Sequence, residues 1–132
     1  MSNLQVFDTP TGKRAVYYST AWSGYDRNFQ IKDIPECVTD VSYAFWNVNA
    51  DGSILTMDDW ADVSKRFVGT DGVSPPDTWN EDGGNVIYGN FGQFKKLRDA
   101  GRKINVTLAL GGWTGSKNFS PAIATDATRT LF

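Results

Sequence analysis

The chain contains three short segments that are apolar, β-branched or aromatic at nearly consecutive positions. They are RAVYYST at 14–20, VTDVSYAFWNV at 38–48 and RKINVTLAL at 102–110. Such composition is typical of buried strands in a parallel sheet. The order strand, crossover, strand, helix, strand, helix is that of parallel βα units with right-handed connections. The segments therefore predict an α/β fold with three parallel strands.

Two architectures have this order of elements, an open doubly wound sheet and a closed (β/α)8 TIM barrel. A nucleotide-binding doubly wound sheet needs a glycine-rich turn such as GxGxxG. The segment GGWTGS at 111–116 has neither that spacing nor the lysine of a phosphate loop. In a barrel, functional residues lie at the C-terminal ends of the strands, where we expect Tyr18, Phe45 and Trp113. The sequence therefore favours the barrel.

The length allows only part of such a barrel. Eight units take about 250 residues, or roughly 30 residues for each unit. The 132 residues therefore predict only the first three βα units, in an incomplete domain over 14–132 that follows an N-terminal extension over 1–13. In an isolated set of three units the outer strands would have unpaired edges, which soluble proteins normally cover. We expect these residues to be part of a longer chain, or to fold only with a complementary segment.

The connection between the second and third strands is long. Near its start, TMDDWADVSKRF at 56–67 predicts a short helix, with Thr56 as the N-cap and Asp59 in the following turn. The segment DGVSPPDTWNEDGG at 71–84 then excludes a regular element over much of its length, because it contains a proline pair and several glycines. Connections of this length are usually functional or mobile.

A better-specified helix precedes the third strand. Asn90 is expected to cap it, with Gln93 three residues later as in a capping box, and Gly101 is expected to end it in a left-handed conformation. A last helix is expected to begin at Thr125 or Asp126. The apolar face of the first of these helices is formed by Phe91, Phe94 and Leu97.

The third strand has two unlike faces. One is apolar and the other carries only small or polar side chains. We expect the apolar face to lie under helices and the small face to look into a confined interior. The apolar face consists of Ile104, Val106, Leu108 and Leu110, and the small face of Asn105, Thr107 and Ala109.

Composition limits the chemistry. The chain has no histidine and a single cysteine, Cys37, which excludes internal disulfides, Cys-His metal sites and Ser-His or Cys-His nucleophiles. Any hydrolysis would depend on carboxylates, and we expect no metal and no cofactor. A net charge of -2, from 13 basic and 15 acidic residues, gives no electrostatic footprint for nucleic acid or a membrane. No signal peptide is visible at the start of the sequence.

The aromatic residues at the predicted strand ends suggest a neutral ligand. A single aromatic side chain there is most often part of the core. Three at equivalent positions, Tyr18, Phe45 and Trp113, with Trp22 in the loop beyond, favour a binding surface instead. Flat aromatic rings suit the apolar face of a pyranose ring. A neutral polysaccharide also agrees with the absence of a charged footprint.

Three segments carry a family resemblance: AVYYSTAWSGYDRNF, VTDVSYAFWNV and YGNFGQFKKLRDAGRKINVTLALGGWTGSKNFS. They resemble the first three βα units of family 18 glycoside hydrolases, the chitinases, and specifically the bacterial chitinase A type. The resemblance implies a TIM barrel and chitin or N-acetylglucosamine oligosaccharides as substrate. It also implies that the remainder of the barrel, in a longer parent polypeptide, is the partner of these residues. The resemblance further implies that this parent polypeptide is secreted.

The resemblance assigns substrate-binding roles to six residues. Tyr18 resembles the strand-one tyrosine near the cleaved sugar, and Phe45 the strand-two aromatic beneath the cleft. Trp22 resembles the tryptophan further along the glycone side, and Trp113 the aglycone-side stacking residue. Ala109 replaces the serine of the Ser-x-Gly-Gly motif, which removes a hydroxyl that would support the catalytic carboxylates. The two remaining binding positions are Gly111 and Gly112, which let the strand turn sharply so that Trp113 stands at the rim.

No catalytic residue is expected in the chain. Family 18 enzymes carry Asp-x-x-Asp-x-Asp-x-Glu on strand four, where the Glu protonates the glycosidic oxygen and the substrate's N-acetyl group attacks the anomeric carbon. No segment of this chain matches that motif. Glu36 precedes the second strand and so lies at the wrong end of a barrel, and Glu81 and Asp82 lie in the long polar connection. We expect Asp58 and Asp59 only to complement a helix dipole.

Three functions remain open. The chain is the N-terminal portion of a chitinase and inactive alone, or a non-catalytic sugar-binding module, for which Ala109 offers slight support. As a third alternative, it is an assembly subunit in which the aromatic residues are merely buried. Binding of chitin oligosaccharides that Trp113→Ala abolishes would favour the module. The absence of any tryptophan fluorescence response to sugars would favour the assembly subunit.

Overall fold

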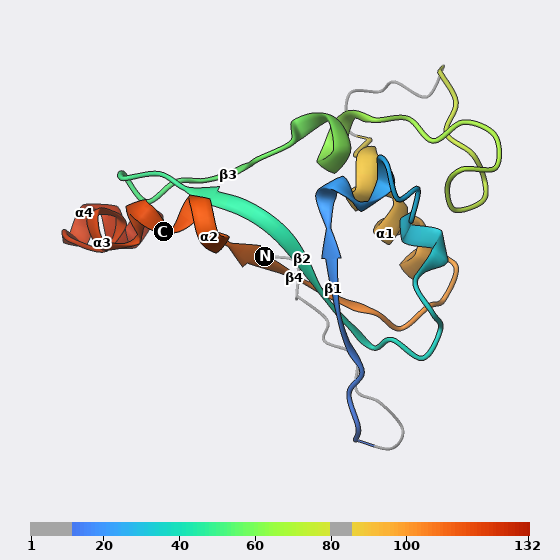
Figure 1. Ribbon diagram of the computed structural model, residues 1–132, viewed down its shortest axis with the longest axis horizontal. Helices are drawn as coiled ribbons and strands as arrows, with labels where there is room; N and C mark the ends of the chain where they lie inside the picture. Colours follow the sequence, from blue (N-terminus) through green and yellow to red (C-terminus); the bar gives the residue numbers. More distant parts are fainter. Residues whose placement is uncertain (1–11, 80–85) are drawn as a thin grey trace.

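The fold is built on three parallel strands, as the sequence predicts. A computed structural model describes residues 12–79 and 86–132 (Figure 1). β1 (Val16–Thr20) pairs with β2 (Asp40–Val48), and β2 pairs with β4 (Asn105–Leu110), both in parallel. Because both neighbours pair with the same part of β2, β2 lies between them. Most of the predicted extension over 1–13 lies outside the described residues, as do Glu81 and Asp82.

A fourth strand was not predicted. β3 (Ile54–Thr56) runs antiparallel to the end of β2 and pairs with Trp46–Val48. The turn between them contains Gly52 at φ +93°, and the Asp51 carboxylate accepts hydrogen bonds from the backbone and hydroxyl of Ser53. The return strand has only three residues and depends on pairing with β2.

Short helical turns and helices connect the strands. Between β1 and β2 lie two 3-10 turns, η1 (Ala21–Gly24) and η2 (Ile31–Asp33), in place of a full helix. The β2–β4 connection contains a π-helical turn, η3 (Trp60–Ser64), and the helix α1 (Gly89–Asp99). After β4 come α2 (Gly112–Gly115), η4 (Ser116–Asn118), α3 (Phe119–Ala122) and α4 (Asp126–Leu131). α1 and the helices α2 to α4 lie at opposite ends of the molecule (Figure 1). No helix in the described parts of the chain has the length and apolar character needed to cross a membrane.

Two predicted helix starts are wrong. Thr56 is the last residue of β3, and the Asp58 carboxylate accepts the hydrogen bond from Ala61 N–H at the start of η3. At α1, Tyr88 occupies the N-cap position without a side-chain hydrogen bond. Asn90 and Gln93 instead bond to distant residues, because their side chains are buried among other elements.

The predicted helix end at Gly101 and the last helix start are confirmed. Gly101 has φ +92°, in the left-handed region that favours glycine. Thr125 caps α4, because its hydroxyl accepts a hydrogen bond from Thr128 N–H at 3.2 Å. Glycine and a capping threonine act within one turn, so both could be read from the local sequence.

One face of the sheet packs against α1. Tyr43 of β2 makes edge-on ring contacts with Phe91 and Phe94 of α1, with centroids 4.9 and 5.9 Å apart. Phe91 and Leu97 pack at the edge of the core, as the helix pattern predicts. The buried core consists of Ala21, Ile31, Ile34, Val38, Val41, Tyr43, Phe94 and Ile104.

The other face of the sheet carries the small and polar side chains. Tyr18, Ser42 and Thr107 are level with one another across the three parallel strands. Side chains alternate along a strand, so these three point away from the face that carries Tyr43. On this second face Val16, Tyr18 and Thr107 are exposed. Within this chain, therefore, the parallel strands are not covered on both faces, which differs from the prediction.

Candidate functional site

Aromatic side chains and glycines meet at the C-terminal ends of β2 and β4. The Trp22 indole, carried by η1, lies 6.2 Å from the Phe45 ring between centroids, with 30° between the planes. Phe45 lies at an irregularity of β2, where the pairing with β4 shifts between Ala44 and Trp46. On the β4 side, a Cβ added to Gly112 would stand 3.2 Å from the Phe45 ring. Phe45 therefore contacts both Trp22 and the turn after β4.

The two glycines after β4 are needed for this turn. Gly111 and Gly112 have φ +84° and +77°. A Cβ on Gly111 would lie 2.6 Å from Ser116 Oγ and 2.7 Å from the Phe119 ring. The strand therefore ends because the backbone reverses into α2 through conformations and spaces that only glycine fits.

Trp113 stands outside the sheet. It is in the first turn of α2 and its side chain is fully exposed. Since Gly111 N–H donates to the carbonyl of Trp46 at 2.8 Å, the turn that presents Trp113 is anchored to β2. An indole with so little intramolecular contact contributes little to packing and is available to a ligand.

Two predicted positions need correction. Tyr18 and Phe45 do not end their strands, because β1 continues to Thr20 and β2 to Val48. Tyr18 is level with Ser42, whereas Phe45 lies further along β2. Tyr18 is 63% exposed, and in the described parts of the chain neither it nor Trp113 makes a ring contact. The structure thus brings Trp22, Phe45 and Gly112 together, whereas Tyr18 lies nearer the N-terminal ends of the strands and Trp113 is exposed on α2.

Further exposed aromatic residues were missed by the sequence analysis. Trp60, on η3, is 57% exposed, and Tyr25 follows η1 with its hydroxyl donating to Asp58 Oδ2 at 2.5 Å. That hydrogen bond, with a smaller effect of burial, raises the pKa of Tyr25 to about 12. η3 is a single π-helical turn, so no periodic pattern could show which side of it is exposed.

A buried carboxylate lies beneath these turns. Asp62 of η3 is 0% exposed and accepts hydrogen bonds from the hydroxyls of Tyr43 and Thr56. Burial is the largest cause that raises the pKa of Tyr43 well above its ordinary value, and the hydrogen bond to Asp62 is the second largest. The Tyr43 hydroxyl is therefore a permanent donor. No group of His, Cys, Asp and Glu suited to a metal ion occurs among residues 12–79 and 86–132.

The other residues singled out in the sequence are Ala109, Glu36, Asp58 and Asp59. Ala109 is half-buried and pairs with Ala44, the residue before Phe45. Glu36 is exposed between η2 and β2, at the N-terminal end of the strands. Asp58 accepts hydrogen bonds from the Tyr25 hydroxyl and the N–H of Ala61, and Asp59 accepts one from the Ser64 hydroxyl.

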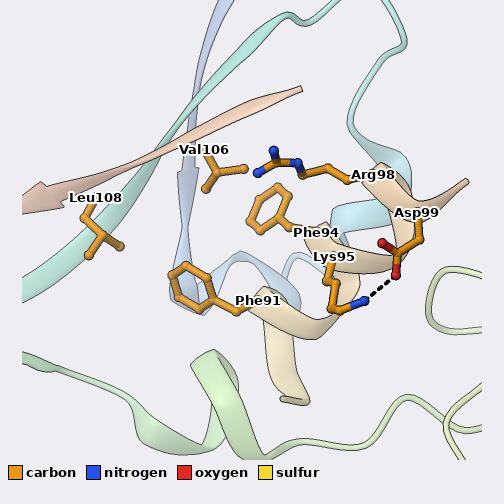
Figure 2. A pocket seen from close by; sticks show the side chains of 7 residues that line it. All are labelled: Phe91, Phe94, Lys95, Arg98, Asp99, Val106 and Leu108. Atoms are coloured by element: carbon orange, nitrogen blue, oxygen red, sulfur yellow. Dashed lines mark hydrogen bonds and ion pairs between the residues drawn. The ribbon is translucent and has the colours of Figure 1, made fainter. Parts of the chain in front are cut away.

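An apolar groove lies on the face of the sheet opposite to Tyr18 and Thr107. It has a volume of about 440 Å³ and is formed between α1 and β4 (Figure 2). Val106 and Leu108 of β4 form one wall, and Phe91 and Phe94 of α1 form the other. Val106 and Leu108 point to the α1 side of the sheet, opposite to Thr107, so this groove is separate from the aromatic site. Lys95, Arg98 and Asp99 complete the lining, with an ion pair between Lys95 and Asp99 at 2.5 Å.

Relatives of the chain are chitinases. It is 40% identical over 131 residues to Endochitinase 1 of Metarhizium robertsii, covering 95% of this chain and 29% of that protein. It is 43% identical over 119 residues to Chitinase 1 of Aphanocladium album, covering 89% of this chain and 26% of that protein. The chain therefore spans less than a third of the length of these relatives.

A solved structure shares the fold. The catalytic domain of the psychrophilic chitinase B from Arthrobacter TAD20 superposes with a TM-score of 0.80 at 31% identity, covering 94% of this chain and 33% of that one. Residues 14–132 also match the family model of the glycosyl hydrolases family 18. The resemblance noted in the sequence is thus confirmed, and the chain belongs to family 18 of the glycosyl hydrolases.

Proposed function

We propose that residues 14–132 are the N-terminal part of a chitinase catalytic domain with the (β/α)8 architecture, preceded by an extension over 1–13. In this proposal β1, β2 and β4 are the first three barrel strands. The observation that supports it is the unequal cover of the sheet. α1 packs on one face, while no element covers Val16, Tyr18 and Thr107 on the other face within the described residues, and Ser42 and Thr107 there are small and polar. Such a face suits the interior of a closed barrel.

The substrate in this proposal is chitin or its N-acetylglucosamine oligosaccharides. Trp22, supported by Phe45, stacks on a sugar on the glycone side, and Trp113 stacks on one beyond the scissile bond. Tyr18 lines the cleft floor, and Gly111 and Gly112 let the substrate approach the backbone. The contact between Trp22 and Phe45 and the full exposure of Trp113 support these roles. They suit sugar recognition because a flat ring covers the apolar face of a pyranose.

The parent protein, meaning the longer polypeptide that we propose contains this chain, cleaves β-1,4 linkages with retention by substrate assistance. Its general acid is the Glu of a strand-four motif that residues 1–132 lack. This chain contributes binding and orientation. Ala109, where the motif has serine, favours one second candidate, a sugar-binding module without hydrolytic activity. In either case the family resemblance implies secretion.

One experiment tests the proposal. The purified 132-residue chain and the parent protein are each incubated with a fluorogenic chitobiose or chitotriose substrate. Hydrolysis by the parent alone supports an N-terminal part of a chitinase. Binding of chitin oligosaccharides by a parent that does not hydrolyse them favours the module. Hydrolysis by the short chain contradicts the proposal and directs attention to Glu81 and Asp82.

The remainder of the barrel is the partner of this chain in the proposal. A right-handed crossover after β4 carries the next helix back beside α1. The groove in Figure 2 lies there, with Leu108 exposed and Val106 half-buried on its wall. The 132-residue chain alone is then expected to lack a cooperative thermal transition as a monomer. A clean monomeric transition would contradict that expectation.

A further inference from the structure

A closed cluster of polar side chains lies under the aromatic turns. The fully buried Asp62 accepts the Tyr43 hydroxyl at Oδ1, with an O···O distance of 2.5 Å, and the Thr56 hydroxyl at Oδ2. Asn90 Nδ2 donates to the Tyr43 hydroxyl oxygen at 2.8 Å. We call these four residues the Asp62 cluster. They come from η3, β2, β3 and α1, so the cluster joins four elements that are distant in the sequence.

The Asp62 cluster reaches the turn that carries Trp22 and the turn that carries Trp60. Asp62 itself belongs to η3, two residues after Trp60. Asn90 Nδ2 also lies 3.5 Å from the carbonyl oxygen of Ala21, the first residue of η1, and Trp22 follows directly. One hydrogen-bonded path therefore runs from the turn of Trp22 to the turn of Trp60.

A second link runs nearer the surface. Asp58 Oδ2 accepts the Tyr25 hydroxyl, and Asp58 Oδ1 accepts the N–H of Ala61 at 3.0 Å. The Asp58 carbonyl also accepts Asp62 N–H at 2.9 Å. Tyr25 is the residue that ends η1, so η1 and η3 are tied at two levels.

The backbone at the start of α1 packs against η3. Gly89 has φ +60°, and a Cβ there would stand 2.4 Å from the carbonyl group of Asp62. Gly89 N–H donates to the carbonyl of Lys65 at 2.8 Å, and Tyr88 N–H donates to that of Val63 at 3.1 Å. The start of α1 therefore fixes η3 from the other side.

Packing alone does not explain a carboxylate at this position. A buried charge costs several kcal/mol of desolvation, and apolar residues of similar volume often stabilise a fold better. Hydrogen bonds also constrain geometry, because the Tyr43 and Thr56 hydroxyls must approach the two Asp62 carboxylate oxygens within a limited range of angles. Such a cluster specifies one arrangement of the turns around it.

We propose that Asp62 is a positioning residue, because its buried carboxylate ties the turn that carries Trp22 to the turn that carries Trp60. The cluster thereby sets the separation and tilt of the Trp22 and Trp60 indoles. A long oligosaccharide contacts the turn that carries Trp22 and the surface beyond it, whereas a short substrate binds mainly where the glycosidic bond is cleaved. Asp62 therefore controls affinity for long substrates and not the chemical step. This inference rests on the proposed function.

The experiment compares Asp62→Ala with Asp62→Asn in the parent protein. Asparagine can accept from Tyr43 through its oxygen and donate to the Thr56 hydroxyl through its nitrogen, so it keeps both links. We expect Asp62→Ala to raise the Kd for chitohexaose about tenfold, and its KM likewise, because a misoriented stacking residue loses part of its binding energy. The kcat for a fluorogenic chitobiose is expected to be unchanged. Asp62→Asn is expected to restore the wild-type Kd.

A second variant keeps the test decisive if Asp62→Ala fails to fold. Thr56→Val removes one donor from a partly exposed strand end and is expected to weaken chitohexaose binding in the same direction. Asp59→Asn is the matched control, because among residues 12–79 and 86–132 its carboxylate accepts a hydrogen bond only from the nearby Ser64 hydroxyl. Unchanged chitohexaose affinity in folded Asp62→Ala or Thr56→Val overturns the inference. A wild-type parent that binds no chitin oligosaccharide overturns the proposed function instead.

Discussion

The Trp22 indole rests against Phe45, with ring centroids 6.2 Å apart and planes inclined by 30°. The two residues come from different elements, η1 and β2, so the orientation of the indole depends on a strand residue beneath it. Phe45 also lies against Gly112 in the turn after β4. The Phe45 ring therefore contacts both η1, through Trp22, and the turn after β4.

Replacing Trp22 is expected to weaken sugar binding more than replacing its support. Trp22→Ala in the parent protein removes the stacking surface and is expected to raise the Kd for chitin oligosaccharides by about 10- to 100-fold, the range that loss of one buried aromatic contact covers. Phe45→Leu keeps the indole but loosens it, and a smaller rise is expected. Isothermal titration calorimetry with chitohexaose measures both. A Trp22→Ala protein with wild-type affinity would exclude Trp22 from the binding surface.

Gly112→Ala is expected to lower the free energy of unfolding of the parent protein by more than the strain of placing an alanine at a positive φ. The new Cβ would stand 3.2 Å from the Phe45 ring at φ +77°. Gly69 has a similar φ of +73° with open space around it, so Gly69→Ala is the matched control for conformational strain. Strain at such a φ costs about 1–2 kcal/mol. Urea unfolding of both variants measures the difference, and equal losses would show that the Phe45 contact adds nothing.

Trp113→Ala is expected to reduce chitin binding without changing stability. The side chain is fully exposed, so its removal leaves no cavity and exposes no core. Trp113→Phe retains a flat ring and is expected to recover part of the affinity. Binding is measured by titration and stability by thermal unfolding. A fall in the melting temperature of Trp113→Ala equal to that of a core variant would show that Trp113 packs within the folded parent.

Much of the fold was predictable because its signals are local. The strands β1, β2 and β4 fall within the apolar segments 14–20, 38–48 and 102–110. Gly101 and Thr125 act within one turn and were interpreted correctly. The spacing of Asn90 and Gln93 imitates a capping box, yet tertiary hydrogen bonds to Tyr43 and Val73 occupy both side chains. A pattern search cannot detect partners that are 47 and 20 residues away.

The candidate site was predictable only in part. Family resemblance identified Trp22, Phe45 and Gly112, which the structure brings into contact, and their role toward sugar stays a prediction. Trp60 and Asp62 were missed, because they lie on one π-helical turn whose exposed and buried sides alternate without a recognisable period. Only the pairing of β3 with β2 and the start of α1 against η3 decide which way this turn faces.

The groove between α1 and β4 is expected to be covered in the parent protein. In a Cys37→Ser background, Leu108→Cys places a thiol on its wall. We expect a maleimide reagent to label this thiol rapidly in the 132-residue chain and slowly in the parent, since the next helix of the barrel would shield it. The unsubstituted short chain and the unsubstituted parent keep the exposed Cys37, and labelling of this thiol in both is the control. Equal labelling of Leu108→Cys in the two proteins contradicts the proposed barrel.

The stability of the parent protein is expected to fall in acid through Asp40. Hydrogen bonding to Arg14 comes first among the causes that hold the pKa of the Asp40 carboxyl well below its ordinary 3.8, and Thr39 and Asn105 add to the effect. A carboxyl whose pKa is lower in the folded than in the unfolded state stabilises the fold above its ordinary pKa. That contribution is lost as the pH falls below it. Asp40→Asn is therefore expected to be less stable than wild type at pH 7 and to lose stability less steeply between about pH 4 and pH 2.

Urea unfolding at a series of pH values measures this slope. Asp126→Asn is a suitable control, because the Asp126 side chain is 95% exposed in an i,i+3 ion pair with Arg129, and exposed pairs contribute little. Asp40 differs because its side chain is 14% exposed and joins Arg14, two residues before β1, to the first residues of β2 and β4. Protonation of Asp40 thus loosens the N-terminal end of all three parallel strands at once. An Asp40→Asn protein with the same acid slope as wild type would show that this carboxylate does not link stability to pH.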